Sequence, residues 1–181
     1  MTGAADPIRF QATLLRPAVP PDAPWCFLLL PAAASAALPT RGLASVEGLF
    51  AGHPFQATLQ PDGHGGHWLR VEPALRAAAG VDPGATVTLA IAPVAVEPEP
   101  AVPEDLARAL AAHPPARAAW DTLTAVARRD WIFWIGTGKQ APTRARRIAS
   151  SCDMLAAGKR RVCCFDRSGM YSKAFAAPQA Q

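Results

Sequence analysis

The chain of 181 residues contains no apolar run long enough to cross a membrane. A spanning helix needs about 20 consecutive apolar residues. The best candidate, "CFLLLPAAASAAL" from Cys26 to Leu38, is shorter and is interrupted by Pro31. The N-terminus, "MTGAADPIRF", lacks the basic start and apolar stretch of a secretory signal peptide. We therefore expect a cytoplasmic protein without a membrane span.

Cysteine is scarce, and its spacing fits neither a disulfide framework nor a zinc site. The four cysteines are Cys26, Cys152, Cys163 and Cys164, of which the last two are adjacent and none forms a CxxC pair. We expect reduced thiols, as is usual in the cytoplasm. Cys26 lies in an apolar run and is predicted to be inert packing.

The sequence also lacks a recognisable catalytic pattern. No cysteine or serine is accompanied by a His–acid arrangement, so covalent catalysis has no support. "DGHGGHW" offers His64 and His67 near Asp62, but zinc needs three or four convergent ligands. We predict a glycine-rich turn there and no metal. We expect no enzymatic activity, no catalytic residue and no cofactor, although an enzyme with a site between two domains stays an alternative.

Charge is unevenly distributed along the chain, whose formal net charge is +4. Residues 1–100 carry 5 basic and 8 acidic side chains, whereas residues 101–181 carry 13 basic and 6 acidic ones. Nine of the basic residues lie between Arg128 and Arg161. This segregation favours an anionic partner for the second half. A solvated, arginine-rich helical surface is the other explanation.

The first 95 residues carry the periodicity of short strands. "IRFQATLL" and "ATVTLAIAPV" alternate apolar and polar residues, as half-buried strands do, and "WCFLLL" is apolar throughout. "ASVEGLF" and "HPFQATLQ" flank Ala51-Gly52, which suits a hairpin turn, and "HWLRV" follows a glycine-rich turn. One short helix is predicted in "PALRAAAG". We predict a small closed β-barrel of about six strands over residues 1–95.

After the barrel, the composition changes to proline and then to helical signals. "VEPEPAVPED" predicts an extended linker at residues 96–102. Residues 103–161 predict about four helices: one from Pro103, one in "PPARAAW", one from about Thr124 to Ile135, and one from Pro142 to near Gly158. Residues 162–181 show little periodicity and predict a loosely ordered tail. The predicted fold class is α+β, a barrel followed by a helical domain.

Six segments occur in an order that resembles one known family. They are "FQATL", "PFQATLQPDGHGGHWLRV" and "LRAAAGVDPGATVTL" in the first half, and "VPEDLARAL", "WIFWIGTGKQAPTRARRI" and "MLAAGKR" in the second. Their order resembles the YdeI/OmpD-associated, or bacteriocin-protection, family, whose members often carry an N-terminal β-barrel domain of unknown function. The chain has Gly138 where the family usually has Ala. The resemblance implies a barrel, a helical domain and a link to tolerance of bacteriocins or antimicrobial peptides, but no catalytic residue.

"WIGTGKQAPTRARRI", from Trp134 to Ile148, contains the strongest candidate site. It is not a nucleotide-binding P-loop, because that pattern requires Gly at position 133 and Ser or Thr at position 140, where the chain has Phe133 and Gln140. The start of the fourth helix can still hold an anion through its free N–H groups. We predict side-chain contacts to this anion from Lys139, Thr143, Arg146 and Arg147.

Arg144 is predicted to have a structural role instead. A helical wheel places it on the apolar stripe of the fourth helix, with Arg146 pointing the opposite way. An inward arginine needs an acidic partner, because burying an unpaired charge costs several kcal/mol. Asp130 lies at the edge of the apolar stripe of the third helix. We therefore predict an Arg144–Asp130 ion pair between these two helices.

The sequence favours a binding function. We expect a cytoplasmic, non-enzymatic binding or adaptor protein, linked by resemblance to bacteriocin or antimicrobial-peptide tolerance or to envelope stress. Its partner is an unknown protein, peptide or anionic ligand. Nucleic-acid binding through residues 128–161 is the main alternative, and it predicts an affinity that falls steeply with salt.

Overall fold

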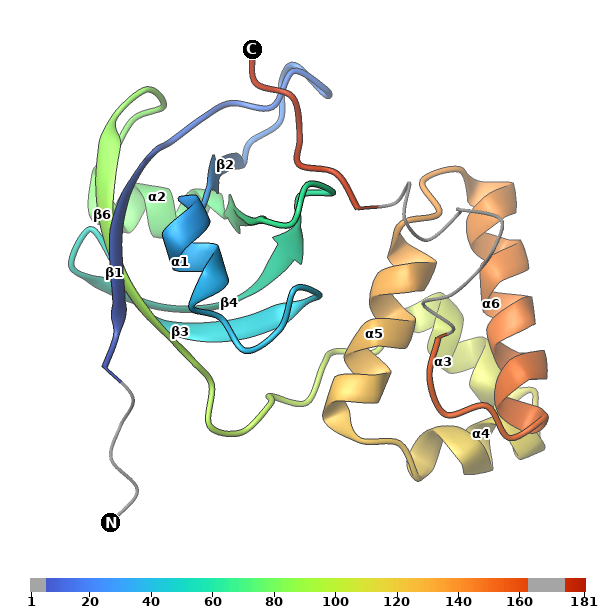
Figure 1. Cartoon of the computed structure of the whole chain (residues 1–181). Helices are drawn as coiled ribbons and strands as arrows, with labels where there is room; N and C mark the ends of the chain where they lie inside the picture. Colours follow the sequence, from blue (N-terminus) through green and yellow to red (C-terminus); the bar gives the residue numbers. More distant parts are fainter. Residues whose placement is uncertain (1–5, 163–174) are drawn as a thin grey trace. The chain divides into compact units, whose positions relative to one another are not determined.

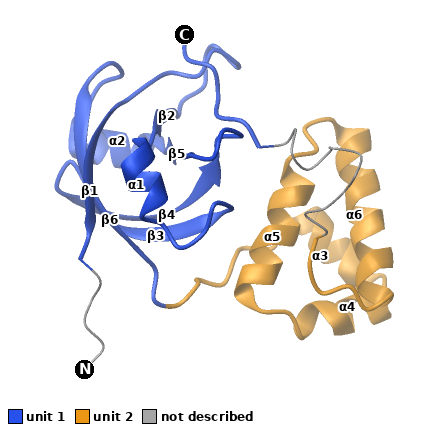
Figure 2. Ribbon diagram, in the orientation of Figure 1, with its two compact units in different colours: residues 1–95, 175–181 blue, residues 96–174 orange. Residues whose placement is uncertain are grey.

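The computed structural model describes residues 6–162 and 175–181. The chain divides into two compact units: unit 1 comprises residues 1–95 and 175–181, and unit 2 comprises residues 96–174 (Figure 2). Each unit encloses its own cluster of buried apolar side chains.

Unit 1 is a barrel of six antiparallel strands (Figure 1). The strands are β1 (Ile8–Thr13), β2 (Cys26–Leu29), β3 (Ala44–Phe50), β4 (His53–Pro61), β5 (His67–Val71) and β6 (Thr86–Pro93). They pair in the order β1-β6-β3-β4-β5-β2. Just beyond β1, Leu15 and Phe27 of β2 exchange backbone hydrogen bonds of 2.8 and 2.9 Å, which joins the two ends of the sheet. The predicted six-stranded barrel is thus confirmed.

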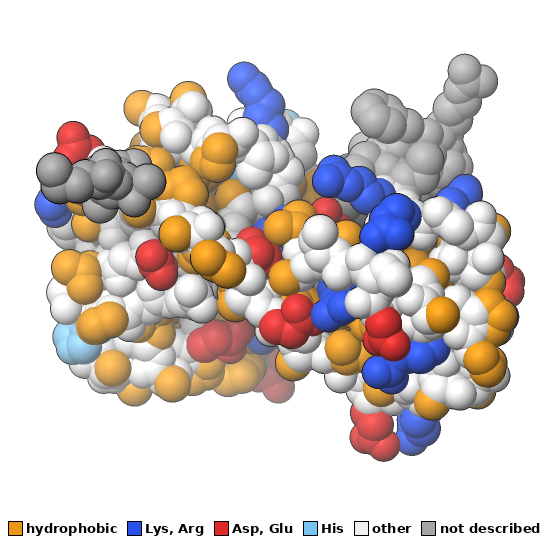
Figure 3. Space-filling model, turned by 90° about the horizontal axis from the view of Figure 1, so that it is seen from below, with side chains coloured by type: hydrophobic (Ala, Val, Ile, Leu, Met, Phe, Trp, Pro, Cys, Tyr) orange, Lys and Arg blue, Asp and Glu red, His pale blue; other side chains and the backbone are white. Residues whose placement is uncertain are grey.

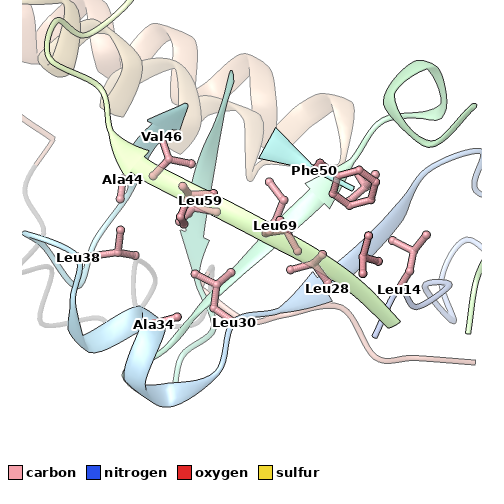
Figure 4. Packing of buried hydrophobic residues seen from close by; sticks show 14 of the residues in the cluster. Leu14, Leu28, Leu30, Ala34, Leu38, Ala44, Val46, Phe50, Leu59 and Leu69 are labelled. Carbon is pink, nitrogen blue, oxygen red and sulfur yellow. The ribbon is translucent and has the colours of Figure 1, made fainter. Parts of the chain in front are cut away.

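The barrel core follows from the alternation that the sequence shows. Val87, Leu89 and Ile91 of β6 are buried, whereas Thr86 and Thr88, which alternate with them, are exposed. Figure 4 shows the inward side chains of several strands gathered into one cluster. Burying each such leucine or valine stabilises the fold by about 1.5–3 kcal/mol. The predicted hairpin is also present, because Ala51 and Gly52 have positive φ values of 47° and 82°.

Two short helices belong to unit 1. α2 (Pro73–Ala79) was expected, with Pro in its first turn and Gly80 ending it in the left-handed conformation. α1 (Ala32–Ala36) was not expected from the sequence, because its five alanine and serine residues after Pro31 show no helical periodicity. Its Ala34 is buried in the barrel core.

Unit 2 consists of four helices in its described part, as the sequence predicts. They are α3 (Glu104–Ala111), α4 (Pro114–Asp121), α5 (Ala125–Gly136) and α6 (Ala141–Ala156). Their apolar faces enclose Leu110, Trp131 and Ile135, each at most 1% exposed. Cys152 also packs in this core, and burial followed by the charge of Asp153 raises the pKa of its thiol. Within the described residues, no helix has the length and apolarity that a membrane span requires.

The segments that the sequence predicts as a linker and a tail make contacts with the two units. In the predicted linker, Glu97 binds Arg129 at 2.9 Å and Glu99 binds Arg128 at 2.6 Å, so this stretch is attached to α5. The tail was expected to be loose, yet residues 175–181 lie along unit 1. Gln179 accepts a 2.7 Å hydrogen bond from the N–H of Ala18. Backbone pairing of this kind needs no side-chain periodicity, so a periodic pattern cannot predict it. Residues 163–174, with Cys163 and Cys164, lie outside the described residues.

Candidate functional site

The sequence predicts an anion site at the junction between α5 and α6. α6 begins after Gln140, whose side chain makes no capping hydrogen bond, and Pro142 occupies the first turn. The first N–H groups of a helix have no partner within the helix, and together with the helix dipole they favour a negative charge. The start of α6 therefore has the free N–H groups on which the prediction of an anion site depends.

The junction is tight because it passes through a buried glycine. At Gly138, a Cβ atom would lie 3.2 Å from the backbone nitrogen and Cα of Arg144 and 3.2 Å from the carbonyl oxygen of Ile135. Gly138 also donates a backbone hydrogen bond to Ile135 at 3.1 Å. The absence of a side chain thus lets the end of α5 lie directly against the first turns of α6.

Three of the four predicted anion-binding side chains remain available at this junction. Lys139, just before α6, and Arg146, in its second turn, are exposed, and neither has an ion pair within the described part of the chain. Thr143 is partly buried in the first turn of α6. These three side chains remain the candidate ligands of an anion.

Arg147, the fourth predicted residue, is engaged within the protein. Its Nη1 donates to the carbonyl oxygen of Trp134 at 2.6 Å and to Oγ1 of Thr137, and its guanidinium lies 5.3 Å from the centre of the Trp134 ring. A cation at the C-terminal end of a helix also compensates the dipole. Burial, followed by the charge of Arg146, lowers the pKa of Arg147. Arg147 therefore holds α6 against the end of α5.

Arg144 forms an ion pair, but its partner is not the predicted Asp130. Its Nε and Nη2 donate to the two carboxylate oxygens of Asp105 in α3, at 2.6 and 2.9 Å. Asp130 is instead paired with its neighbour Arg129 at 3.0 Å. The helical wheel identified the inward face of α6 correctly, but it does not tell which helix packs against that face. The pKa of Asp105 is lowered, mainly by the hydrogen bond from Arg144, whereas partial burial acts in the opposite direction.

A second candidate site, not predicted from the sequence, is a cavity of about 490 Å³ in unit 1. It lies between two segments: α1 with the loop that follows it, and the turn between β4 and β5. Thr40 and Arg41 of the loop and Asp62 and His64 of the turn provide its polar lining. Antiparallel pairing of Ala44 with Leu59 brings the residues before β3 and after β4 to the same end of the barrel.

Both walls of this cavity are fixed by hydrogen bonds. Asp62 Oδ1 accepts from the N–H groups of His64 and Gly66 at 2.8 and 2.9 Å, which holds the glycine-rich turn. His67, only 1% exposed, donates its backbone N–H to Ser35 Oγ at 3.0 Å. Its ring Nε2 lies 2.9 Å from the carbonyl oxygen of Gly42 and must donate to it. His67 thus attaches α1 and the following loop to β5.

The predicted glycine-rich turn is therefore present, and His67 begins the strand β5 that follows it. Among the described residues, no group of three or more His, Cys, Asp or Glu side chains is arranged to hold a metal ion. His67 Nδ1 is buried without a hydrogen-bond partner in the same part of the chain. The signal that the sequence did offer for this cavity was the hairpin itself, since a hairpin brings its two flanking segments together.

The fold defines a two-part α+β protein, a small antiparallel barrel followed by a unit with four helices in its described part. Comparison with known families agrees with this division. Residues 99–158 match the family described as "Bacteriocin-protection, YdeI or OmpD-Associated" (OmdA), and residues 10–91 match "Domain of unknown function (DUF1905)". Residues 99–158 thus carry the domain of the YdeI/OmpD-associated family, and the barrel carries the domain of unknown function, as the resemblance implied. A search of curated proteins finds no match to the chain.

Proposed function

We propose that this protein acts by binding rather than by catalysis, in the cytoplasm, in tolerance of bacteriocins or antimicrobial peptides. The description of its family as a bacteriocin-protection family supports the biological role. In this proposal, unit 2 contacts an anionic group of its partner at the start of α6.

The observation that carries the proposal is the uncapped start of α6 beside Lys139, Thr143 and Arg146. The dipole contributes about 0.3–1 kcal/mol toward an anion at such a position. A hydrogen bond to a charged group contributes about 1.5–3 kcal/mol more. Because Arg144 and Arg147 are engaged elsewhere, they hold the junction in shape without competing for the ligand.

The distribution of charge favours a local contact over a broad basic surface. On the face that Figure 3 shows, the Lys and Arg side chains of unit 2 are interspersed with Asp and Glu. Arg108 and Arg117, for instance, are paired with Glu104 and Asp121 on their own helices. A partner with one or two carboxylates or phosphates fits this arrangement better than an extended polyanion.

A binding experiment tests the site with inorganic phosphate, a glutamate-rich peptide and a single-stranded DNA as probes. We expect Lys139→Gln and Arg146→Gln each to weaken phosphate or peptide binding several-fold. Arg117→Gln is the matched control, because it removes the same charge from α4, at the other end of α6 (Figure 1). Equal effects of all three substitutions would contradict the local site. Tight DNA binding with a steep dependence on salt would favour the nucleic-acid alternative.

The biological role is tested in the source bacterium. Deleting the gene is expected to increase sensitivity to a bacteriocin, and the wild-type gene is expected to restore tolerance. The Lys139→Gln, Arg146→Gln double variant is expected not to restore it, at equal protein level. Unchanged sensitivity after deletion would contradict the proposed role.

A further inference from the structure

We propose that the cavity of unit 1 binds a small zwitterion with an apolar body, of the size of an amino acid or a dipeptide. This inference concerns the barrel alone and does not depend on the function proposed for unit 2. It rests on two unpaired opposite charges, an apolar floor and two fixed walls, all formed by described residues of one compact unit.

Two opposite charges line the cavity without neutralising each other. Arg41 and Asp62 both line it, yet no ion pair within 4.0 Å joins them. Asp62 uses Oδ1 to hold the turn, which leaves Oδ2 without a hydrogen bond in the described part of the chain. Arg41 likewise has no hydrogen bond or ion pair there, although its Nη1 lies 3.4 Å from the position of a Cβ at Gly65. The cavity thus offers one free cation and one free carboxylate oxygen.

These two groups select for a ligand that carries both charges. An anion alone would be attracted by Arg41 but repelled by Asp62. A cation alone would be attracted by Asp62 but repelled by Arg41. A molecule with a carboxylate and an ammonium can form a charge-assisted hydrogen bond to each. Because Arg41 and Asp62 form no ion pair with each other, both remain available to such a molecule.

The remaining lining suits an apolar side chain. Leu30, Leu38 and Pro39 line the cavity beside the alanines of α1, and Figure 4 shows Leu30, Ala34 and Leu38 together at one end of the barrel core. The volume of about 490 Å³ lies within the range of about 300–1,000 Å³ that is usual for small-molecule sites.

The site is also formed in advance of binding. Asp62 fixes the turn, and His67 fixes Ser35 and Gly42 on the opposite wall. A ligand would therefore lose little affinity to the ordering of loops. The two walls come from segments that a single hairpin holds together.

The experiment uses the full chain and four probes: leucine, leucyl-leucine, N-acetyl-leucine and leucinamide. The first two are zwitterions of different length, the third is an anion and the fourth is a cation. Binding is followed through the backbone amide NMR signals of Gly65 and Gly66. We expect leucine or leucyl-leucine to bind at least tenfold more tightly than either singly charged probe, and the tighter of the two identifies a free amino acid or a peptide as the ligand.

Substitutions test the two charges separately. Arg41→Gln is expected to weaken zwitterion binding at least tenfold and to abolish the preference over leucinamide. Asp62→Asn keeps an oxygen that can accept the hydrogen bonds of the turn. This variant is expected to abolish the preference for the zwitterion over N-acetyl-leucine. Arg9→Gln, at an exposed position of β1 outside the cavity, is the matched control and should change neither preference. Equal binding of all four probes, no binding at millimolar concentration, or an equal effect of Arg9→Gln would overturn the proposal.

Discussion

Arg144 of α6 binds both carboxylate oxygens of Asp105 in α3, with its Nε 2.6 Å from one and its Nη2 2.9 Å from the other. The two residues are far apart in sequence, so this pair attaches α6 to α3. Asp105 Oδ1 also accepts the backbone N–H of Leu106 at 2.9 Å, which orients the carboxylate. The arrangement is bidentate, the geometry in which arginine pairs are strongest.

A double-mutant cycle will show which aspartate is the partner of Arg144. Both side chains of the observed pair are about a third exposed, so we expect a coupling free energy of about 1 kcal/mol between Arg144→Gln and Asp105→Asn. Between Arg144→Gln and Asp130→Asn we expect a coupling near zero. Urea unfolding measures both cycles. A larger coupling to Asp130 would show that the pair predicted from the sequence forms in solution.

The same pair predicts a loss of stability in acid. The hydrogen bond from Arg144 lowers the pKa of Asp105 below its ordinary value of 3.8. The folded state therefore binds this proton less readily than the unfolded state does, and the stabilisation is complete above about pH 5. It is lost as the pH falls below 3.8 and through the folded pKa. Unfolding free energies measured between pH 6 and pH 2.5 should fall less steeply for Asp105→Asn than for the wild type. Parallel curves would mean that Asp105 is not held by Arg144.

Glu97 is predicted to stabilise unit 2, although the sequence places it in a linker. The Glu97 and Arg129 side chains are only 13% and 15% exposed, and removing one partner of a poorly solvated pair leaves the other charge with less compensation. Because Arg129 keeps Asp130, we expect Glu97→Gln to cost about 1–2 kcal/mol, below the usual range for fully buried pairs. Glu104→Gln is the control: its pair with Arg108 is exposed, and its loss should cost less than about 0.5 kcal/mol. Thermal and urea unfolding measure the loss of stability of each variant. Equal losses for Glu97→Gln and Glu104→Gln would show that the linker is not attached to α5.

Local patterns in the sequence were sufficient to predict the six strands, α2 and the four helices of the described part of unit 2. Alternating residues such as Val87, Leu89 and Ile91 indicate a strand because each inward side chain must be apolar. Four helices followed from their prolines, glycines and apolar stripes. α1 escaped prediction because its five residues carry no period. The contacts of residues 175–181 escaped prediction because they are backbone hydrogen bonds and two bonds from the Gln181 side chain to backbone carbonyls, which leave no periodic pattern in the sequence.

Long-range contacts could be predicted only in part. The wheel of α6 shows that Arg144 faces inward, but Asp105 and Asp130 are both acidic residues at helix surfaces, and packing alone decides between them. Arg147 was assigned to an anion because the sequence does not show that the carbonyl group of Trp134 lies within its reach. The cavity beside Arg41 depends on two loops that only the closed barrel shapes.

Gly48 is predicted to be essential for the barrel because two strands meet at its Cα. It lies in β3, between β4 and β6, and a Cβ there would fall 2.0 Å from the carbonyl oxygen of Ala90 and 2.9 Å from Cα of Ile91. These atoms belong to the backbone of β6 and cannot move aside without breaking the β3–β6 pairing. We expect Gly48→Ala to destabilise unit 1 by at least about 2 kcal/mol, at the upper end of overpacking effects. Gly42→Ala is the control, since the nearest atom to its Cβ would be Thr40 Oγ1 at 3.5 Å, an ordinary contact. Circular dichroism and urea unfolding compare the two variants, and an equal loss for both would show that β3 and β6 lie farther apart in solution.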